Sequence, residues 1–111
     1  MDVQVEQEVV GTRTVVRVAG EVDVASADRL REQLARTVAE GGTDLVVDLT
    51  AVSFMDSTGL GLLVGTLKRV RTAGGRMALV IDSEQLMKIF TITGLHQVFT
   101  IHGTLEAALA G

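Results

Sequence analysis

Apolar and polar residues alternate with a period of two near the start of the chain. Val3 and Val5 are separated by polar residues, and Val16 and Val18 repeat the alternation after Gly11-Thr12. A period of two is typical of a strand that is buried on one face. Because Gly-Thr suits a turn between two such runs, the pattern predicts an antiparallel hairpin that ends near Gly20.

The spacing then changes to three and four residues, which predicts an amphipathic helix. Its predicted inward positions are Ala27, Leu30, Leu34 and Val38. Asp23 and Ser26 are both residue types that cap helix N-termini, and the sequence leaves the choice between them open. Gly41-Gly42 predicts the end of this helix.

The run "DLVVDLTAV" that follows is too short for a helix and predicts a buried strand over Leu45–Leu49. A second helix is predicted from Ser57 to the glycine pair at Gly74-Gly75. Its predicted inward positions are Leu60, Leu63, Val64, Leu67 and Val70. The pattern therefore continues as strand and then helix.

The last third of the chain repeats that alternation. "RMALVI" predicts a strand, and a short helix follows a Ser83 cap, with Leu86, Ile89 and Phe90 facing inward. "QVFTI" predicts a last strand and "TLEAALA" a last helix. The order β-β-α-β-α-β-α-β-α predicts one α/β domain over residues 1–111. Its sheet is mixed and mostly parallel, with an N-terminal hairpin and about four packed helices.

The composition narrows the chemistry of this domain. Hydrophobic residues make up 47% of 111, with three phenylalanines and no Trp or Tyr, so the core is aliphatic. The chain has no cysteine, which excludes disulfides and thiolate metal sites, and two histidines are too few for a histidine-rich site. We therefore expect no metal and no bound cofactor.

The charge distribution bears on partners and location. The net charge is −4, and no basic stripe with interleaved aromatics is present, which argues against nucleic-acid binding. No apolar run reaches the roughly 18 residues of a membrane span, and the N-terminus does not resemble a signal peptide. We expect a cytoplasmic protein that does not bind membranes.

The candidate chemistry lies in "SFMDSTGLGLLVGTL", which starts at Ser53. Asp56, Ser57 and Thr58 stand where the second helix should begin, and all three residue types cap helices. A capping role would place Ser57 at the surface. It leaves open whether the serine is also a nucleophile, part of a phosphate-binding loop, or a site of modification.

A hydrolase nucleophile is the first of these alternatives. The nucleophile elbow G-x-S-x-G matches at Ser57 and Gly59 but has Met55 at the place of its first glycine. The remaining triad members would have to be Asp82 or Glu84 with His96 or His102. A small serine hydrolase is therefore a disfavoured alternative.

A phosphate-binding loop is the second alternative. "GLGLLVG" has closely spaced glycines, but no Lys-Ser/Thr follows them and they fall inside the helical pattern. Gly61 and Gly65 are four residues apart, and we expect them to allow close approach of the sheet or of a partner. Without such a packing reason, glycine would weaken the helix relative to alanine.

Phosphorylation of Ser57 is the third alternative. A phosphate there would sit at a helix N-terminus, where backbone N–H groups and the helix dipole favour an anion. It would add about −1.5 to −2 charges at pH 7. The fold would persist, but a partner bound at the same surface would be repelled.

Long stretches of the chain resemble the anti-sigma factor antagonists, the bacterial members of the STAS domain family. The resemblance is carried by "GEVDVASADRLREQL", "LVVDLTAVSFMDSTGLGLLVGTLKRVRTAGG" and "LMKIFTITGLHQVF". These stretches follow in order from the Gly20-Glu21-x-Asp23 turn to the last helix. D-S-T-G alone would be weak, but D-S-T-G-L-G within these flanks is specific.

The resemblance implies a switch rather than an enzyme. Family members in the unphosphorylated form sequester a cognate anti-sigma factor, which is itself a serine kinase, and thereby free a sigma factor. That kinase uses its own ATP to phosphorylate the serine that matches Ser57, which releases the complex, and a serine phosphatase reverses the modification. A STAS scaffold or sensor domain that is never phosphorylated is the remaining alternative.

The resemblance also assigns residues to the partner surface. The expected set is Glu21, Asp23, Asp56, Ser57, Thr58, Gly59, Leu60 and Gly61. Leu60 fits the core equally well by its spacing. Thr58 is a second hydroxyl, although the match favours Ser57 as the acceptor. We expect a monomer or a weak dimer.

Overall fold

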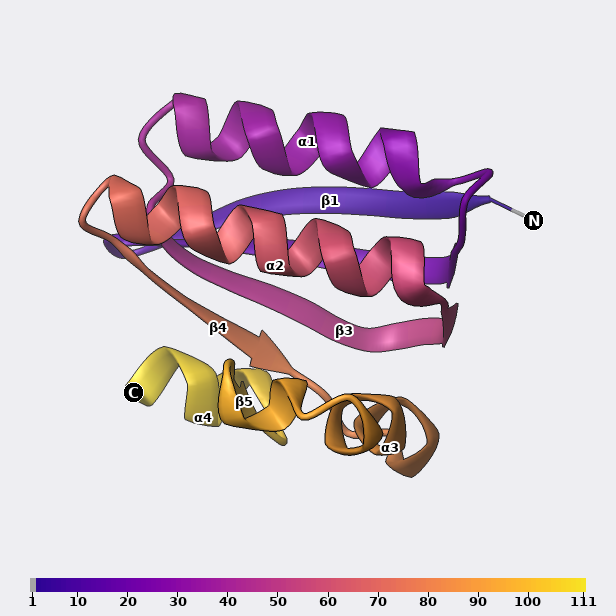
Figure 1. The fold of residues 1–111 in the computed structure, drawn as a ribbon. Coiled ribbons are helices and arrows are strands. Elements are labelled where there is room, and N and C mark those ends of the chain that lie inside the picture. The colour runs from indigo at the N-terminus through magenta and orange to yellow at the C-terminus, as the bar shows by residue number, and fades with distance from the viewer. Residues whose placement is uncertain (1) are drawn as a thin grey trace.

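A five-stranded mixed sheet forms the middle of the protein in the computed structural model, which describes residues 2–111 (Figure 1). Its strands are β1 (Val3–Val10), β2 (Arg13–Val22), β3 (Asp44–Met55), β4 (Arg76–Val80) and β5 (Thr100–His102). They lie side by side in chain order. β1 and β2 form the predicted antiparallel hairpin, and the other neighbours are parallel. The predicted mixed α/β fold is confirmed.

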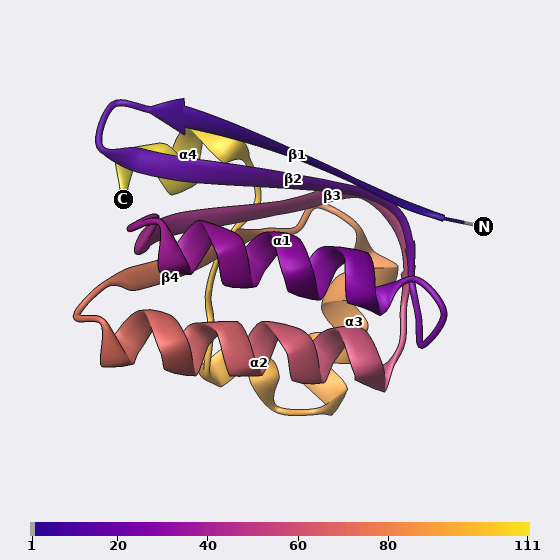
Figure 2. The ribbon, with the colours of Figure 1, turned by 90° about the horizontal axis from the view of Figure 1, so that it is seen from above.

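Helices cover both faces of this sheet (Figure 2). They are α1 (Ala27–Ala39), α2 (Ser57–Thr72), α3 (Glu84–Ile92) and α4 (Leu105–Ala110), with a short 3₁₀ helix η1 (Leu95–Gln97) after α3. α1, α2 and α3 lie on one face and α4 on the other. A parallel strand needs a crossover connection, and α1, α2 and α3 each supply one.

The core has two parts because the central strands are buried on both faces. In β3, Leu45 and Val47 point toward α1 and α2, whereas Val46 points to the opposite face. The larger part includes Leu30, Leu34, Leu63, Leu67, Val70, Leu79, Leu86 and Phe90. The smaller part lies under α4. The near-continuous apolar run of β3 follows from this double burial.

Two strands differ from their predictions. β3 continues past Leu49 to Met55, because the more polar segment that follows still pairs with the end of β2. The last strand is Thr100–His102 rather than residues 97–101. Gly94, with φ of 77°, ends the preceding turn, and the next three residues form η1 instead of a strand.

Three predicted inward positions, Val38, Val64 and Ile89, are only half-buried, although all three pack against the core. Val38 of α1 is only half-buried, and Thr37 is buried beside it, with its hydroxyl donating to the side-chain oxygen of Gln7 at 2.6 Å. Val64 of α2 is half-buried, whereas its predicted inward neighbours are buried. A polar residue replaces Val38 in the interior because β1 offers it a hydrogen-bond partner.

A buried arginine anchors the C-terminal helix. Arg13 of β2 donates to Asp44 Oδ1 at 2.9 Å and to the backbone oxygen of Ala108 at 2.5 Å. Arg76 also donates to Asp44, and it reaches the backbone oxygen of Gly111 at 3.1 Å. A helix of six residues is unstable alone, so these bonds and the burial of Ala108 hold α4 on the sheet.

Replacing Arg13 with methionine should therefore destabilise the fold. The variant leaves the Ala108 oxygen without its donor and Asp44 with one cation fewer, for a cost of about 1–3 kcal/mol in the free energy of unfolding. Urea unfolding followed by circular dichroism measures it.

Arg17→Met is the matched control, because Arg17 makes an exposed 3.4 Å ion pair with Glu8. Its cost should stay below about 1 kcal/mol. Equal costs for the two variants would show that Arg13 does not anchor α4.

Candidate functional site

The start of α2 is fixed by Asp56. Its backbone is extended, and its Oδ1 accepts hydrogen bonds from the backbone N–H of Thr58 at 2.9 Å and of Gly59 at 3.3 Å. Its own N–H donates to the backbone oxygen of Val22 at 3.1 Å. Of the three capping candidates, Asp56 is the N-cap, and it ties the start of α2 to the end of β2.

Ser57 therefore does not cap α2. It is exposed in the first turn of α2, and its hydroxyl makes no hydrogen bond to any part of the chain that the structure describes. Thr58 beside it is half-buried. Because Asp56 supplies the cap, a change at the Ser57 oxygen does not remove a contact that holds the helix.

Gly59 and Leu60 are buried within this chain. A Cβ at Gly59 would lie 2.7 Å from Met55 Cγ and 2.9 Å from Val22 Cγ1. Leu60 is 7% exposed and belongs to the core. Both residues set how closely α2 packs on β2 and β3. They belong to the expected partner set, but their side chains are buried under the surface that a partner would contact.

Gly61 and Gly65 differ from Gly59. Both are exposed, and a Cβ at either position would meet no atom of residues 2–111 within 4 Å. The prediction that these two glycines allow close approach of the sheet is wrong, and the close contact belongs to Gly59 instead. Approach of a partner remains a prediction.

The loop between β2 and α1 is held by its own hydrogen bonds. The buried Ser26 hydroxyl donates to the backbone oxygen of Glu21 at 2.7 Å. Asp23 Oδ1 accepts from the backbone N–H of Ala25 and of Ser26, each at 3.0 Å. Ser26 holds the N-cap position of α1 without a side-chain cap bond, so both candidates brace the loop rather than cap the helix.

This loop and Ser57 lie at the same edge of the sheet. Glu21 is paired in register with Phe54, and the next pair is Val22 with Met55. The carboxyl ends of β2 and β3 therefore bring the acidic loop beside the start of α2, as the resemblance implied. Phe54, 50% exposed, lies at the same edge. Sequence reasoning missed it because an apolar residue at the end of a strand gives no sign of its exposure.

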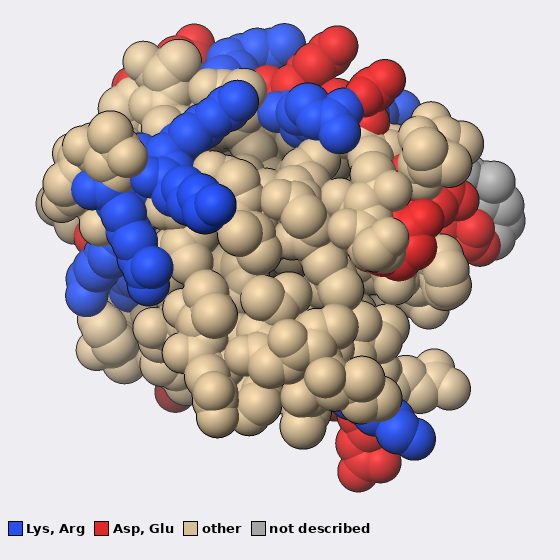
Figure 3. Space-filling model, in the orientation of Figure 1, with Lys and Arg blue, Asp and Glu red and all other residues tan. Residues whose placement is uncertain are grey.

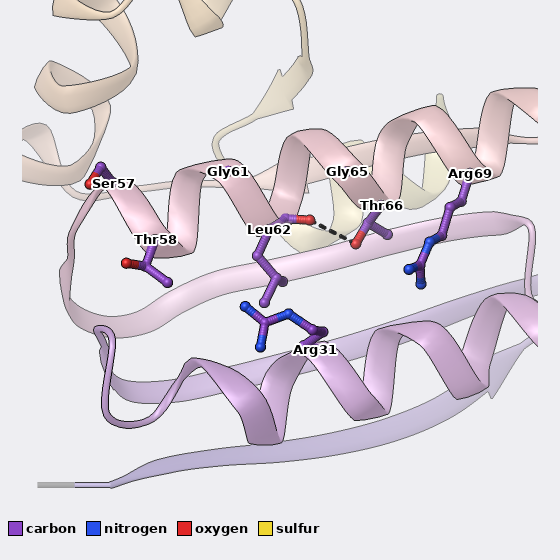
Figure 4. A pocket seen from close by; sticks show the side chains of 8 residues that line it. All are labelled: Arg31, Ser57, Thr58, Gly61, Leu62, Gly65, Thr66 and Arg69. Carbon is purple, nitrogen blue, oxygen red and sulfur yellow. Dashed lines mark hydrogen bonds between the residues drawn. The ribbon is translucent and has the colours of Figure 1, made fainter.

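A groove of about 300 Å³ runs between α1 and α2, with Ser57 at one end (Figure 4). Its lining residues are Arg31, Ser57, Thr58, Gly61, Leu62, Gly65, Thr66 and Arg69. Arg31 extends from α1 and Arg69 from α2, and both side chains point toward the space between the helices. The sequence pattern singled out the α2 glycines, but it did not indicate that Arg31 and Arg69 share a groove.

The geometry does not assemble a hydrolase around Ser57. His96 Nδ1 lies 3.4 Å from the backbone oxygen of Phe90, and His102 lies beside Gly111. Neither histidine is hydrogen-bonded to Ser57 within residues 2–111. A nucleophilic serine requires an adjacent base, so the triad has no support here.

Other site types also lack a basis in the part of the chain described. The glycines of "GLGLLVG" lie within helix α2, not in a loop before it, so the phosphate-loop alternative is wrong. Residues 2–111 contain no group of three or more His, Asp or Glu side chains placed to hold a metal ion. No helix among those residues is long and apolar enough to cross a membrane.

Comparison with known proteins matches this arrangement to one family. The STAS domain model matches residues 1–108, and the chain belongs to the STAS domain family. A Bacillus subtilis relative named anti-sigma-B factor antagonist is 48% identical over 94 residues, 85% of each chain.

Two solved structures extend the comparison. An anti-sigma factor antagonist from Mycobacterium paratuberculosis is 30% identical, with a TM-score of 0.91 over 97% of this chain and 92% of its own. The Bacillus cell fate determinant SpoIIAA in its phosphorylated form is 28% identical, with a TM-score of 0.74 over 96% of this chain and 97% of its own.

The packing of α2 predicts opposite effects for two neighbouring glycines. Gly59→Ala forces its methyl group against Met55 and Val22, and we expect a loss of about 1–3 kcal/mol in the free energy of unfolding. Gly61→Ala meets open space and should be neutral or gain about 0.5–1 kcal/mol. Urea unfolding of both variants tests this, and equal stabilities would contradict the packing role of Gly59.

The loop at Asp23 predicts a pH dependence. The backbone N–H of Ser26, which donates to this carboxylate, holds the pKa of Asp23 below its usual 3.8. A lowered pKa in the folded state means that the ionised carboxylate stabilises the fold above pH ~4. That contribution is lost as the pH falls through the lower folded-state value.

Asp23→Asn keeps the acceptor oxygen but removes the charge. The difference in urea midpoint between wild type and this variant should therefore be constant from pH 5 to 7 and shrink below pH ~4. A difference that stays the same at pH 3 would contradict the role of the carboxylate charge.

Proposed function

We propose that the protein is an anti-sigma factor antagonist whose binding is controlled by phosphorylation of Ser57. In the unphosphorylated form it binds and sequesters an anti-sigma factor that is also a serine kinase, and a sigma factor is released. Phosphorylation of Ser57 by that kinase dissociates the complex, and a serine phosphatase regenerates the unphosphorylated form. The observation that carries the proposal is the exposed Ser57 hydroxyl, which makes no hydrogen bond within residues 2–111. It lies beside an acidic loop that is held by its own hydrogen bonds.

The position of the hydroxyl supports a role as substrate. A kinase must bring ATP within reach of the acceptor oxygen, and Ser57 is exposed at the end of a groove. Asp56 already caps α2, so phosphorylation need not break a hydrogen bond of the fold. The names of the relatives support antagonism of an anti-sigma factor as the activity.

Electrostatics supports release on phosphorylation. The N–H groups of Thr58 and Gly59 already donate to Asp56, so a phosphate on Ser57 must point outward unless it displaces that carboxylate. It would add about −1.5 to −2 charges next to Asp56. A partner group that packs against the neutral Ser57 hydroxyl would meet this added bulk and charge, and a like-charge contact costs several kcal/mol. Since 1.4 kcal/mol is tenfold, affinity should fall by about a hundredfold or more.

The expected partner surface follows from exposure. Glu21, Asp23, Asp56 and Thr58 are half-buried, whereas Ser57 and Gly61 are exposed. These residues would touch the anti-sigma factor directly, above the buried Gly59 and Leu60. ATP would belong to the partner. We expect the protein to act in the cytoplasm as a monomer or weak dimer.

Phosphate transfer tests the proposal. The protein is incubated with Mg-ATP and the purified anti-sigma factor from the same organism, and intact-mass spectrometry should find one added phosphate. Ser57→Ala should abolish it and bind the factor persistently, and Ser57→Asp should bind weakly. Because aspartate carries less charge than phosphate, its defect is expected to be partial.

Ser53→Ala is the matched control, because Ser53 is exposed four residues earlier and its hydroxyl donates to Gly20 O. It should accept phosphate as wild type does. Binding without any phosphate transfer would instead support a scaffold domain. Turnover of a model ester, lost in Ser57→Ala, would support the hydrolase. Absence of both binding and transfer with every anti-sigma factor of the organism would overturn the proposal.

A further inference from the structure

The groove between α1 and α2 extends the surface at Ser57 along the molecule. Ser57 and Thr58 line one end of it, and Thr66 and Arg69 line it two to three turns further along α2. Ser57 is thus adjacent to the near end of this groove. The groove is therefore continuous with the proposed modification site.

The two arginines of the groove lack strong partners among the residues that the structure describes. Arg69 is exposed and forms no ion pair with any residue that the structure describes. Arg31 pairs with Asp28, three residues earlier on α1, and both side chains are largely exposed. Such an exposed pair contributes little, so Arg31 remains available to another anion.

Charge is distributed unevenly over this face of the protein (Figure 3). Lys and Arg side chains gather over the end of α2 that leads into β4, and Asp and Glu gather at the opposite end. Arg31 and Arg69 point into the groove from its two walls (Figure 4), whereas Glu21, Asp23 and Asp56 belong to the edge that carries Ser57. Two cations facing one space create a potential that attracts an anionic group.

The floor of the groove is open between these charges. Gly61 and Gly65 line it, and a Cβ at either would meet nothing within 4 Å. Glycine destabilises a helix relative to alanine, and nothing within residues 2–111 packs closely enough to require it at these two positions. The absence of side chains there lets a second protein lie close to the α2 backbone.

We propose that this groove is a second docking site for the anti-sigma factor, which places an acidic segment between Arg31 and Arg69. The segment lies against Gly61 and Gly65, with its acidic groups held away from the acidic edge at Ser57. This inference rests on the proposed function and adds the chemistry of the partner to it. It gives the complex a fixed orientation along α2, because opposite charges meet only one way round.

Charge reversal at Arg69 and charge removal at Arg31 test the groove, in a protein that cannot be phosphorylated at Ser57. All variants are made in the Ser57→Ala protein, and the dissociation constant for the purified anti-sigma factor is measured by calorimetry at two salt concentrations. Arg69→Glu and Arg31→Gln should each weaken binding by about tenfold at low salt. Both should reduce the dependence of affinity on salt, because screening acts on the charges they remove.

Lys88→Glu is the matched control. Lys88 is exposed on α3, outside the groove, and the substitution changes the net charge by as much as Arg69→Glu. Its affinity should stay within about twofold of the parent. Equal weakening by Lys88→Glu and Arg69→Glu would mean that net charge alone governs binding, which overturns the docking site.

A steric variant gives an independent test. Gly61→Ala with Gly65→Ala adds two methyl groups to the groove floor where the chain itself has room, so the fold should be retained. Affinity should again fall by about tenfold. If the charge variants and this variant all bind like the parent, the groove is not a docking site although the proposed function stands. If the Ser57→Ala parent binds no anti-sigma factor, the proposed function itself fails.

Discussion

The turn at Asp56 is the constraint on which the rest of the site depends. Its carboxylate caps α2 and its N–H bonds to the end of β2, so one residue fixes where the helix starts and beside which loop. Gly59 then allows α2 to settle on Met55 and Val22. With capping assigned to Asp56, Ser57 is left exposed and without a hydrogen bond in the described chain. Because Asp56 makes the capping hydrogen bonds, the Ser57 hydroxyl remains accessible at the surface.

The stabilising contacts and the proposed binding surface are separated in the fold. The sheet is buried on both faces, and α4 is anchored by Arg13 and Asp44 near the starts of β2 and β3. The site lies at the carboxyl ends of those same strands, where parallel strands place their following loops together. A charge added at Ser57 therefore acts on what binds there, while the contacts that hold the fold lie elsewhere.

Much of the fold and part of the site followed from the sequence. The periods of two and of three to four residues predicted the hairpin, the helices and the mixed sheet. The motif around Ser57 and its resemblance to anti-sigma factor antagonists indicated the family. The errors fell where local pattern and tertiary pairing disagree: β3 runs on to Met55 through a more polar segment because β2 pairs with it, and η1 replaces the start of the last strand after Gly94.

The sequence by itself determined most of the secondary structure, the family and the candidate serine, because periodicity, capping residues and motifs are local. Only the tertiary structure decided which glycine packs and which are open, since Gly59 and Gly61 look alike in the sequence but lie on opposite sides of α2. It also decided that Arg31 and Arg69 share a groove, because they are 38 positions apart and meet only when α1 and α2 pack together. Side-chain neighbours across elements depend on packing, which no local pattern records.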